Sequence, residues 1–353
     1  MYDGKRITVT TTRLALALSD GLPEGDFLVI GARGADDLSP LDPGRTRIQQ
    51  GHFPDHRALA ARGFQVAPVV DGRFDAVLVI LPRSKTEARA RIADAASRLT
   101  PGAALWIDGQ KTDGIDSVLR EMRSLAPVDE VHSKAHGKIF AFAAPETSVF
   151  ADWQAQPTVL ADGSVTLPGI FSADGPDPGS ELLAASLPEK LSGFGADLGA
   201  GWGYLARAVL TRPGIRQLDL IEAEHMALDC ARRNVSDPRA TFVWADATRY
   251  QPAQRYDFIL SNPPFHTGRA ADPSLGAAFI RAAARMLTPS GTFWMVANRH
   301  LPYEATLRDA FREVEEVAGT GAFKIFRASR AAVATRPAPG RSASAVDRRR
   351  PAR

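Results

Sequence analysis

The feature of this sequence that most constrains its fold is an internal duplication. Residues 73–78 (RFDAVL) recur as residues 255–260 (RYDFIL), at an offset of 182. Three further matches follow in the same order at offsets up to 188: residues 99–101 with 287–289, 128–131 with 314–317, and 138–140 with 324–326. Chance similarity does not readily produce four ordered matches at nearly constant spacing, so the sequence predicts two copies of one structural unit.

Each copy alternates segments typical of strands with segments typical of helices. A short apolar run, at 76–81 and again at 258–260, precedes a segment rich in alanine and arginine, at 87–99 and again at 275–287. Apolar residues in the longer segments recur every three or four positions, as expected for a helix with one buried face. Such alternation predicts an α/β fold with mostly parallel sheets and helices on both faces.

Length and composition divide the chain into two domains and a tail. A chain of 353 residues exceeds what one hydrophobic core usually supports. The stretch 145–179 is rich in Pro, Gly, Asp and Ser, which places one domain at residues 1–150 and the other at 151–330. Residues 331–353 are mostly Pro, Ala, Ser and Arg, so we expect a disordered basic tail.

Charge and residue usage restrict the class of protein. The net charge of +3, to which the tail contributes, is compatible with nucleic-acid binding without indicating it. No apolar run approaches the roughly 20 residues of a membrane span, and no signal peptide opens the sequence, so we expect a cytoplasmic protein. Cys230 is the only cysteine, and Pro54 interrupts the His52/His56 pair, so we expect no metal site.

Three alternating glycines in the second copy indicate a ligand-binding loop. Gly199, Gly201 and Gly203 follow Asp197, at the end of a predicted strand, and precede a predicted helix. Glycine permits positive φ and close approach of the backbone to a ligand, and the free N–H groups of a helix start suit an anionic group. A tight turn without a ligand and a nicotinamide dinucleotide site would both give the same pattern.

Two acidic positions further along the chain favour an adenosine site. Glu222 ends the next predicted strand, 19 residues beyond Gly203, where a carboxylate can accept hydrogen bonds from ribose hydroxyls. Asp246, with Ala247 beside it, follows a third predicted strand, and can accept a hydrogen bond from an exocyclic amine. Together these acids predict a nucleoside site at the carboxyl ends of parallel strands.

The segment Asn262, Pro263, Pro264 and Phe265 ends a fourth predicted strand in a rigid turn. The Asn262 side-chain oxygen and a proline-stiffened carbonyl can accept hydrogen bonds from the two hydrogens of an aryl amine, and Phe265 can stack on the base. An aryl amine is a poor nucleophile because its lone pair is delocalised. The segment therefore predicts a site that positions such an amine for methyl transfer without a strong general base.

At these residues the chain resembles the class I S-adenosylmethionine methyltransferases that modify exocyclic or amide nitrogens. It is most similar to the ribosomal RNA small subunit methyltransferase C family, over about residues 74–328. The motifs that carry the likeness are residues 167–172 (LPGIFS) with Asp177, Gly179, Ser180, Leu182 and Leu183; residues 262–265 with His266 and Gly268; Ala297 and Asn298 with Leu301, Pro302 and Tyr303; and Gly321 with residues 323–328.

This resemblance implies a fold, a reaction and a set of site residues. It implies two tandem Rossmann-like class I methyltransferase domains, of which only the second binds S-adenosylmethionine. The implied reaction is methylation of the exocyclic N2 amine of a guanine in 16S ribosomal RNA. The implied partners are ribosomal RNA or the 30S subunit, including its assembly intermediates, and the protein itself is expected as a monomer or weak dimer. The implied catalytic residues are Asn262, Pro263, Pro264 and Phe265; the implied cofactor-binding residues are Asp197, Gly199, Gly201, Gly203, Glu222, Asp246, Ala247 and Asn262, with Phe171 and Ser180 at the cofactor entrance.

Other functions stay open at this point. A large-subunit rRNA guanine-N2 methyltransferase shares the same motif chemistry, and a protein glutamine or adenine-N6 methyltransferase uses a similar proline turn. A non-catalytic RNA-binding assembly protein would belong to a different class, although the intact Asp197, Glu222, Asp246 and Asn262 argue against it.

The first copy has lost the catalytic motif. Residues 80–83, Ile-Leu-Pro-Arg, stand where the second copy has residues 262–265, and residues 29–34 lack the full glycine pattern. We therefore expect a structural or RNA-docking role for this domain, with chaperoning of the second domain as the alternative. The basic residues that could contact phosphate there are Arg33, Arg45, Arg47, Arg83 and Lys85.

Overall fold

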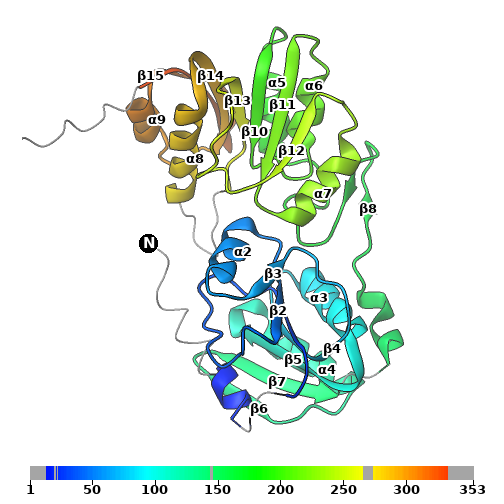
Figure 1. Cartoon of the computed structure of the whole chain (residues 1–353). Helices are drawn as coiled ribbons and strands as arrows, with labels where there is room; N and C mark the ends of the chain where they lie inside the picture. The colour runs from blue at the N-terminus through cyan, green and yellow to red at the C-terminus, as the bar shows by residue number, and fades with distance from the viewer. Residues whose placement is uncertain (1–12, 20, 22, 144–145, 265–272, 333–353) are drawn as a thin grey trace, which may run out of the picture.

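The computed structural model describes residues 13–19, 21, 23–143, 146–264 and 273–332 (Figure 1). Phe265, His266 and Gly268 therefore lie outside the described residues, as does the predicted basic tail beyond residue 332.

The first copy folds, within the described residues, into a sheet with the strand order β3-β2-β1-β4-β5-β7-β6. Its strands are β1 (Phe27–Ile30), β2 (Thr46–Gln49), β3 (Gln65–Ala67), β4 (Phe74–Ile80), β5 (Leu99–Gln110), β6 (Val131–Lys134) and β7 (Gly137–Ala143). Neighbours from β3 to β5 pair in parallel, whereas β7 runs antiparallel to both β5 and β6.

The second copy repeats this topology strand for strand, in the order β12-β11-β10-β13-β14-β16-β15. Its strands are β10 (Gly193–Leu198), β11 (Ile215–Glu222), β12 (Ala240–Trp244), β13 (Tyr256–Ser261), β14 (Leu287–Asn298), β15 (Phe311–Gly319) and β16 (Phe323–Ala331). Here β16 is the antiparallel strand. The predicted pair of mostly parallel sheets is confirmed, and the duplicated motif forms the central strands β4 and β13.

Helices cover both faces of each sheet (Figure 1). They are α2 (Phe53–Ala60), α3 (Lys85–Ser97), α4 (Ile115–Leu125), α5 (Pro178–Ser186), α6 (Tyr204–Leu210), α7 (His225–Asn234), α8 (Pro273–Met286) and α9 (Glu304–Ala310). Alternate residues of β13 enter opposite cores: Ile259 packs in a cluster with α8 and α9, whereas Phe258 and Leu260 pack in a cluster with α5, α6 and α7. Burial on both faces explains why the central strands read as continuous apolar runs.

The link between the sheets contains the short helices and strands η2 (Thr147–Trp153), β8 (Thr158–Val159) and β9 (Val165–Thr166). Phe150 and Trp153 of η2 pack against the core of the first sheet. A further short helix, η1 (Lys111–Asp113), precedes α4.

The start of α2 corrects one expectation from the sequence. Pro54 does not break a helix there but lies in the first turn of α2, with His52 as the residue that precedes the helix. Proline is well tolerated in a first helical turn, because the N–H that it lacks has no partner within the helix.

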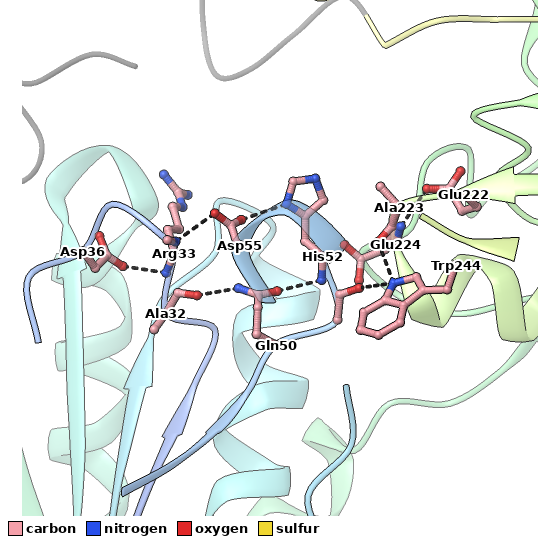
Figure 2. A network of polar contacts seen from close by, with 12 residues as sticks. Ala32, Arg33, Asp36, Gln50, His52, Asp55, Glu222, Ala223, Glu224 and Trp244 are labelled. Atoms are coloured by element: carbon pink, nitrogen blue, oxygen red, sulfur yellow. Dashed lines mark hydrogen bonds and ion pairs between the residues drawn. The ribbon is translucent and has the colours of Figure 1, made fainter. Parts of the chain in front are cut away.

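The two domains meet through equivalent segments, as Figure 2 shows. The loop after β2 pairs antiparallel with the loop after β11, with His52 opposite Glu224. The Phe53 N–H donates to the Ala223 carbonyl at 2.8 Å, and the His225 N–H donates to the Gly51 carbonyl at 2.9 Å. Both loops leave the carboxyl end of the second strand of their copy, so the contact has approximate two-fold symmetry and brings these strand ends towards each other.

Trp244, at the end of β12, reinforces this contact. Its indole N–H lies 3.0 Å from the Gly51 carbonyl and 2.8 Å from the Ala223 carbonyl, one acceptor from each domain. Its ring makes edge contacts with Phe53 and His225, at centroid distances of 5.1 and 5.3 Å.

Candidate active site

The glycine loop lies between β10 and α6, at the carboxyl edge of the second sheet. Gly199, Gly201 and Gly203 have φ values of 76°, 55° and 91°, so all three are in the left-handed region that favours glycine. A Cβ at Gly203 would lie 2.8 Å from the Val235 side chain, whereas a Cβ at Gly201 would meet no atom within 4 Å. Gly203 is therefore required by packing, and Gly201 faces open space where a ligand could approach.

Two buried carboxylates stand beside this loop. Asp197 on β10 is fully buried, and neither of its carboxylate oxygens has a hydrogen-bond partner among the described residues. Burial, together with the nearby charge of Glu222, raises the pKa of Asp197 to about 8. Burial likewise raises the pKa of Glu222, against backbone hydrogen bonds that lower it.

Glu222 fixes the loop from the neighbouring strand. Its Oε2 accepts a hydrogen bond from the Gly201 N–H at 2.8 Å, and its Oε1 accepts one from the Glu224 N–H at 2.7 Å. The carboxylate thus ties the glycine loop to the start of α7. The carboxylate keeps acceptor capacity that a ligand hydroxyl could use.

Asp246 closes the turn that follows β12. Its Oδ1 accepts hydrogen bonds from the Thr248 N–H at 2.8 Å and the Thr248 hydroxyl at 2.6 Å. Ala247 is buried beside it. Glu222 ends β11 and Asp246 follows the neighbouring strand β12, so both lie at the carboxyl edge of the sheet, as expected from the sequence.

Asn262, the first residue after β13, has a fixed side-chain amide. Its Nδ2 donates to the Asp177 Oδ2 and to the Ser180 Oγ, both at 2.8 Å. Those two bonds use both amide hydrogens, so the Oδ1 is the atom that remains to accept a hydrogen bond from a substrate. Pro263 and Pro264 follow directly, and Phe265 lies outside the described residues.

The segment before α5 connects the glycine loop with Asn262. The Trp202 indole N–H donates to the Ser172 carbonyl at 3.2 Å, and the Trp202 ring is buried with Ile170 in a small apolar cluster. Trp202 therefore packs beneath the loop. Phe171 is 55% exposed, an unusual state for a phenylalanine side chain. Ser180 reaches Asn262 as described above.

The first domain reaches the edge of this site. His52 bonds to Asp55 at 2.8 Å (Figure 2). Burial lowers the pKa of His52, but this hydrogen bond and the carboxylates of Asp55, Glu224 and Glu222 raise it by more. Burial raises the pKa of Glu224 to about 7. The interface thus lies within electrostatic reach of the carboxylate that holds the glycine loop.

Among the residues that the structure describes, the first copy shows no equivalent site. Ile80 and Leu81, which replace Asn262 and Pro263, are buried apolar residues. By strand register Val29 holds the place of Asp197, because each pairs with the same leucine of the repeated motif. Gln50 holds the place of Glu222 at the end of the second strand.

The five basic residues considered for phosphate binding do not form one cluster. Arg45 donates to the carbonyls of Pro23 and Gly25, and Arg47 lies over the Phe74 ring, both at the amino end of the sheet. Lys85 pairs with Glu121 at 2.6 Å, and Arg83 lies 3.9 Å from Asp113. The Arg33 guanidinium has no hydrogen-bond partner among the described residues, and Figure 2 shows its side chain extending away from Ala32.

Reasoning from the sequence missed the contact between Asp177 and Asn262. Asp177 was part of the family motif, but nothing in the sequence joins it to a residue 85 positions away. The only local signal is the order Asp-Pro-Gly-Ser, typical of a helix start.

Two negative findings apply to the part of the chain that the structure describes. No helix there is long and apolar enough to cross a membrane. Within the same residues, no group of three or more His, Cys, Asp or Glu side chains could hold a metal ion.

The repeated topology, with a glycine loop and acidic strand ends in the second copy, defines the chain as an α/β protein of the class I methyltransferase fold. Residues 163–327 match the family Methyltransferase small domain, and residues 20–156 match Methyltransferase small domain N-terminal. The chain belongs to the ribosomal RNA small subunit methyltransferase C family.

Individual relatives support this assignment. The ribosomal RNA small subunit methyltransferase C of Shewanella pealeana is 34% identical over 72% of this chain and 77% of its own length. The protein of the same name from Klebsiella pneumoniae is 31% identical over 90% of this chain and 95% of its own. Among solved structures, a T. Thermophilus 16S rRNA N2 methyltransferase, in complex with AdoMet and guanosine, has a TM-score of 0.74, 25% identity and 93% coverage of both chains.

Proposed function

We propose that this protein transfers a methyl group from S-adenosylmethionine to the exocyclic N2 amine of a guanine in 16S ribosomal RNA. Family membership supports the reaction and the substrate class, since similar proteins carry that name or hold AdoMet and guanosine. The observation that carries the proposal is the Asn262 amide, whose hydrogens are both engaged by Asp177 and Ser180. Its free Oδ1 is a hydrogen-bond acceptor, as an amine substrate requires.

The residues around the glycine loop fit S-adenosylmethionine. When bound, this cofactor supplies an electrophilic methyl group on a positively charged sulfonium. The unpartnered oxygens of Asp197 and the open space at Gly201 suit a cationic ligand held close to the backbone. Glu222 would accept hydrogen bonds from ribose hydroxyls, and Asp246 would accept one from the adenine amine.

Further cofactor contacts are part of the same proposal. Gly199 and Gly203 would shape the loop, Ala247 would line the adenine side, and Phe171 and Ser180 would line the entrance. These roles come from the family resemblance.

The chain's own residues would position the amine rather than deprotonate it. The Asn262 Oδ1 would accept one amine hydrogen, and a backbone carbonyl of the proline turn would accept the other, while Phe265 would stack on the base. Two acceptors favour a more pyramidal nitrogen, whose lone pair is then available for in-line attack. The bonds strengthen as the nitrogen becomes positively charged, so they stabilise the transition state more than the ground state.

We further propose a division of labour along the chain. Residues 151–330 would form the catalytic domain, and residues 1–150 a methyltransferase-like domain that supports it or docks RNA, since Ile80 stands in the first copy where the second has Asn262. The substrate would be 16S rRNA, free or within the 30S subunit or its assembly intermediates, bound by a cytoplasmic monomer or weak dimer.

The test begins with cofactor and product. Calorimetric titration with S-adenosylmethionine should give binding, and 16S rRNA from a deletion strain should lose an N2-methylguanosine. No binding heat from folded protein would rule out the enzyme. If 16S rRNA is unchanged and 23S rRNA loses the same nucleoside, the substrate is the large-subunit rRNA.

Asn262→Ala then tests the site. Turnover should fall on the order of 10²-fold, as when one transition-state hydrogen bond is removed, while the Kd for S-adenosylmethionine stays within about threefold. Ile80→Ala, at the equivalent position of the first copy, is the matched control and should leave turnover per folded molecule unchanged. Lost cofactor binding with normal turnover per occupied site would contradict the role given to Asn262.

A further inference from the structure

The amide group of Asn262 can be placed in two orientations that differ by exchange of oxygen and nitrogen. In one, the Oδ1 faces the substrate and accepts a hydrogen bond from an amine. In the other, the Nδ2 faces the substrate and presents a donor to a donor. Only the first orientation is compatible with an amine substrate.

Asp177 is the residue that distinguishes the two orientations. A carboxylate only accepts hydrogen bonds, so its Oδ2, 2.8 Å from Asn262, requires the Nδ2 on that side. The Ser180 hydroxyl, also at 2.8 Å, can donate or accept, and would tolerate either orientation. Of the two partners, the carboxylate therefore fixes the amide.

The position of Asp177 is itself fixed by α5. Asp177 caps this helix: the same Oδ2 accepts a hydrogen bond from the Ser180 N–H at 2.9 Å, and Pro178 occupies the first turn. Leu183 of α5 is fully buried in the cluster that contains Leu260 of β13. The helix is thus anchored on the strand that ends at Asn262, and its capping carboxylate is held next to the amide.

We propose that Asp177 is a positioning residue that acts through Asn262, by holding the amide so that its oxygen faces the methyl-accepting amine. This inference rests on the proposed function, because it assumes that Asn262 receives an amine. On this view Asp177, at the start of α5, is the reason why the site accepts a substrate group that donates hydrogen bonds.

The first variant is Asp177→Ser. Serine is a good helix cap, so its hydroxyl can still accept from the Ser180 N–H, but it is one bond shorter and no longer reaches Asn262. We expect kcat to fall at least tenfold, with the Kd for S-adenosylmethionine and the melting temperature close to those of the parent. Asp177→Ser with a parental kcat would overturn the proposal.

Asp177→Asn is the conservative variant. The Ser180 N–H still requires an acceptor, so the new asparagine should place its side-chain oxygen where the Asp177 Oδ2 lies. That oxygen can also accept the hydrogen bond from the Asn262 Nδ2. We expect kcat within about threefold of the parent. Equal impairment of the asparagine and serine variants would show that charge rather than orientation matters, and would overturn the proposal.

A double variant separates positioning from a merely structural role. If Asp177 acts through Asn262, then Asp177→Ser should have no further effect on kcat in an Asn262→Ala background. An equal loss in both backgrounds would mean that Asp177 acts independently of Asn262, contrary to the proposal.

A readout without substrate keeps this inference distinguishable from the proposed function. The sequence contains only Asn234, Asn262 and Asn298, so asparagine-selective ¹⁵N labelling gives three side-chain amides. Asp177→Ser should shift the Asn262 NH₂ signals and speed their hydrogen exchange, leaving those of Asn234 unchanged. If the parent fails to methylate 16S rRNA, the proposed function fails; if the parent is active but the Asn262 signals do not move, the role of Asp177 fails.

Discussion

Asp197 should couple cofactor binding to the release of a proton. Its carboxyl is fully buried, has no hydrogen-bond partner among the described residues, and lies near Glu222. With a pKa of about 8 in place of the usual 3.8, roughly nine in ten Asp197 side chains are protonated at pH 7 in the unligated protein. A positively charged ligand beside the carboxyl favours the ionised form, so binding should expel that proton.

The expected magnitude follows from linkage. If Asp197 is ionised in the complex, the affinity for S-adenosylmethionine rises about tenfold per pH unit below pH 8, and levels off above it. Between pH 6 and pH 8 the Kd should fall about 50-fold, with release of about 0.9 proton at pH 7. Asp197→Asn removes the titrating group, so its affinity should be weaker and independent of pH over this range.

The same shift has a consequence for stability. Because the folded pKa lies above the unfolded value, ionisation of the unfolded chain lowers stability progressively between pH 4 and pH 8. At pH 7 the contribution is at most about 4 kcal/mol. Asp197→Asn should therefore raise the free energy of unfolding of the unligated protein, and the gain should grow with pH up to about 8.

Calorimetry in buffers of different ionisation enthalpy measures the proton release directly. Asp246→Asn is the matched control: it changes another carboxylate of the same site and should leave the proton count unchanged. Binding that releases no proton at pH 7, or an Asp197→Asn variant with the parental pH dependence, would refute the reasoning.

Two smaller perturbations test the loop and the interface. Gly201→Ala should lower the free energy of unfolding by only about 1 kcal/mol, because the added Cβ meets no atom, yet weaken cofactor binding; Gly203→Ala should cost more, because its Cβ would lie 2.8 Å from Val235. Equal losses in chemical denaturation would contradict this account. Trp244→Phe should weaken domain docking by about 1 kcal/mol, since the indole hydrogen bond to the Gly51 carbonyl of the first domain is lost. Faster proteolysis between the domains would reveal it, and an unchanged rate would count against it.

The fold could be predicted from the sequence because the duplication reports on the most buried strands. The repeated motif forms β4 and β13, the central strands of their sheets. Both faces of these strands are buried, so each copy needs apolar residues there. Residues at the end of a strand or directly after it, such as Glu222 and Asn262, could also be placed, because parallel strands bring their carboxyl ends to one edge.

Contacts between distant segments could not be predicted in the same way. The hydrogen bond from Asn262 to Asp177 depends on how α5 docks against the sheet, and no pattern within either segment records that docking. The domain interface was also missed, because the hydrogen bonds between its two loops join backbone atoms of Gly51, Phe53, Ala223 and His225. Every residue has the same backbone atoms, so a contact between backbone atoms does little to restrict which residues occur there.

Because the two interface loops bond through backbone atoms, the two domains could come to differ in function without losing their contact. In the first copy the Gln50 amide donates to the Ala32 carbonyl, whereas in the second the Glu222 carboxylate accepts from the Gly201 N–H. Ala32 and Ala200 are equivalent, so these bonds engage opposite ends of the same peptide group. Glutamine can donate to the carbonyl end, but a carboxylate can only accept from the N–H end, and that orientation accompanies the positive φ of Gly201.

The first copy has Gln50 where the second has Glu222, and Arg33 where the second has Gly201. With these two exchanges one peptide group has the opposite orientation, so the loop no longer presents that N–H group to a ligand. Val29 in place of Asp197 removes the buried charge that a cationic ligand would meet. None of these exchanges touches the backbone bonds between the domains, so the first copy could lose its site while keeping its partner. Restoring a cofactor site there would need all three positions changed together, since a carboxylate at Gln50 alone would face the Ala32 carbonyl, a second acceptor.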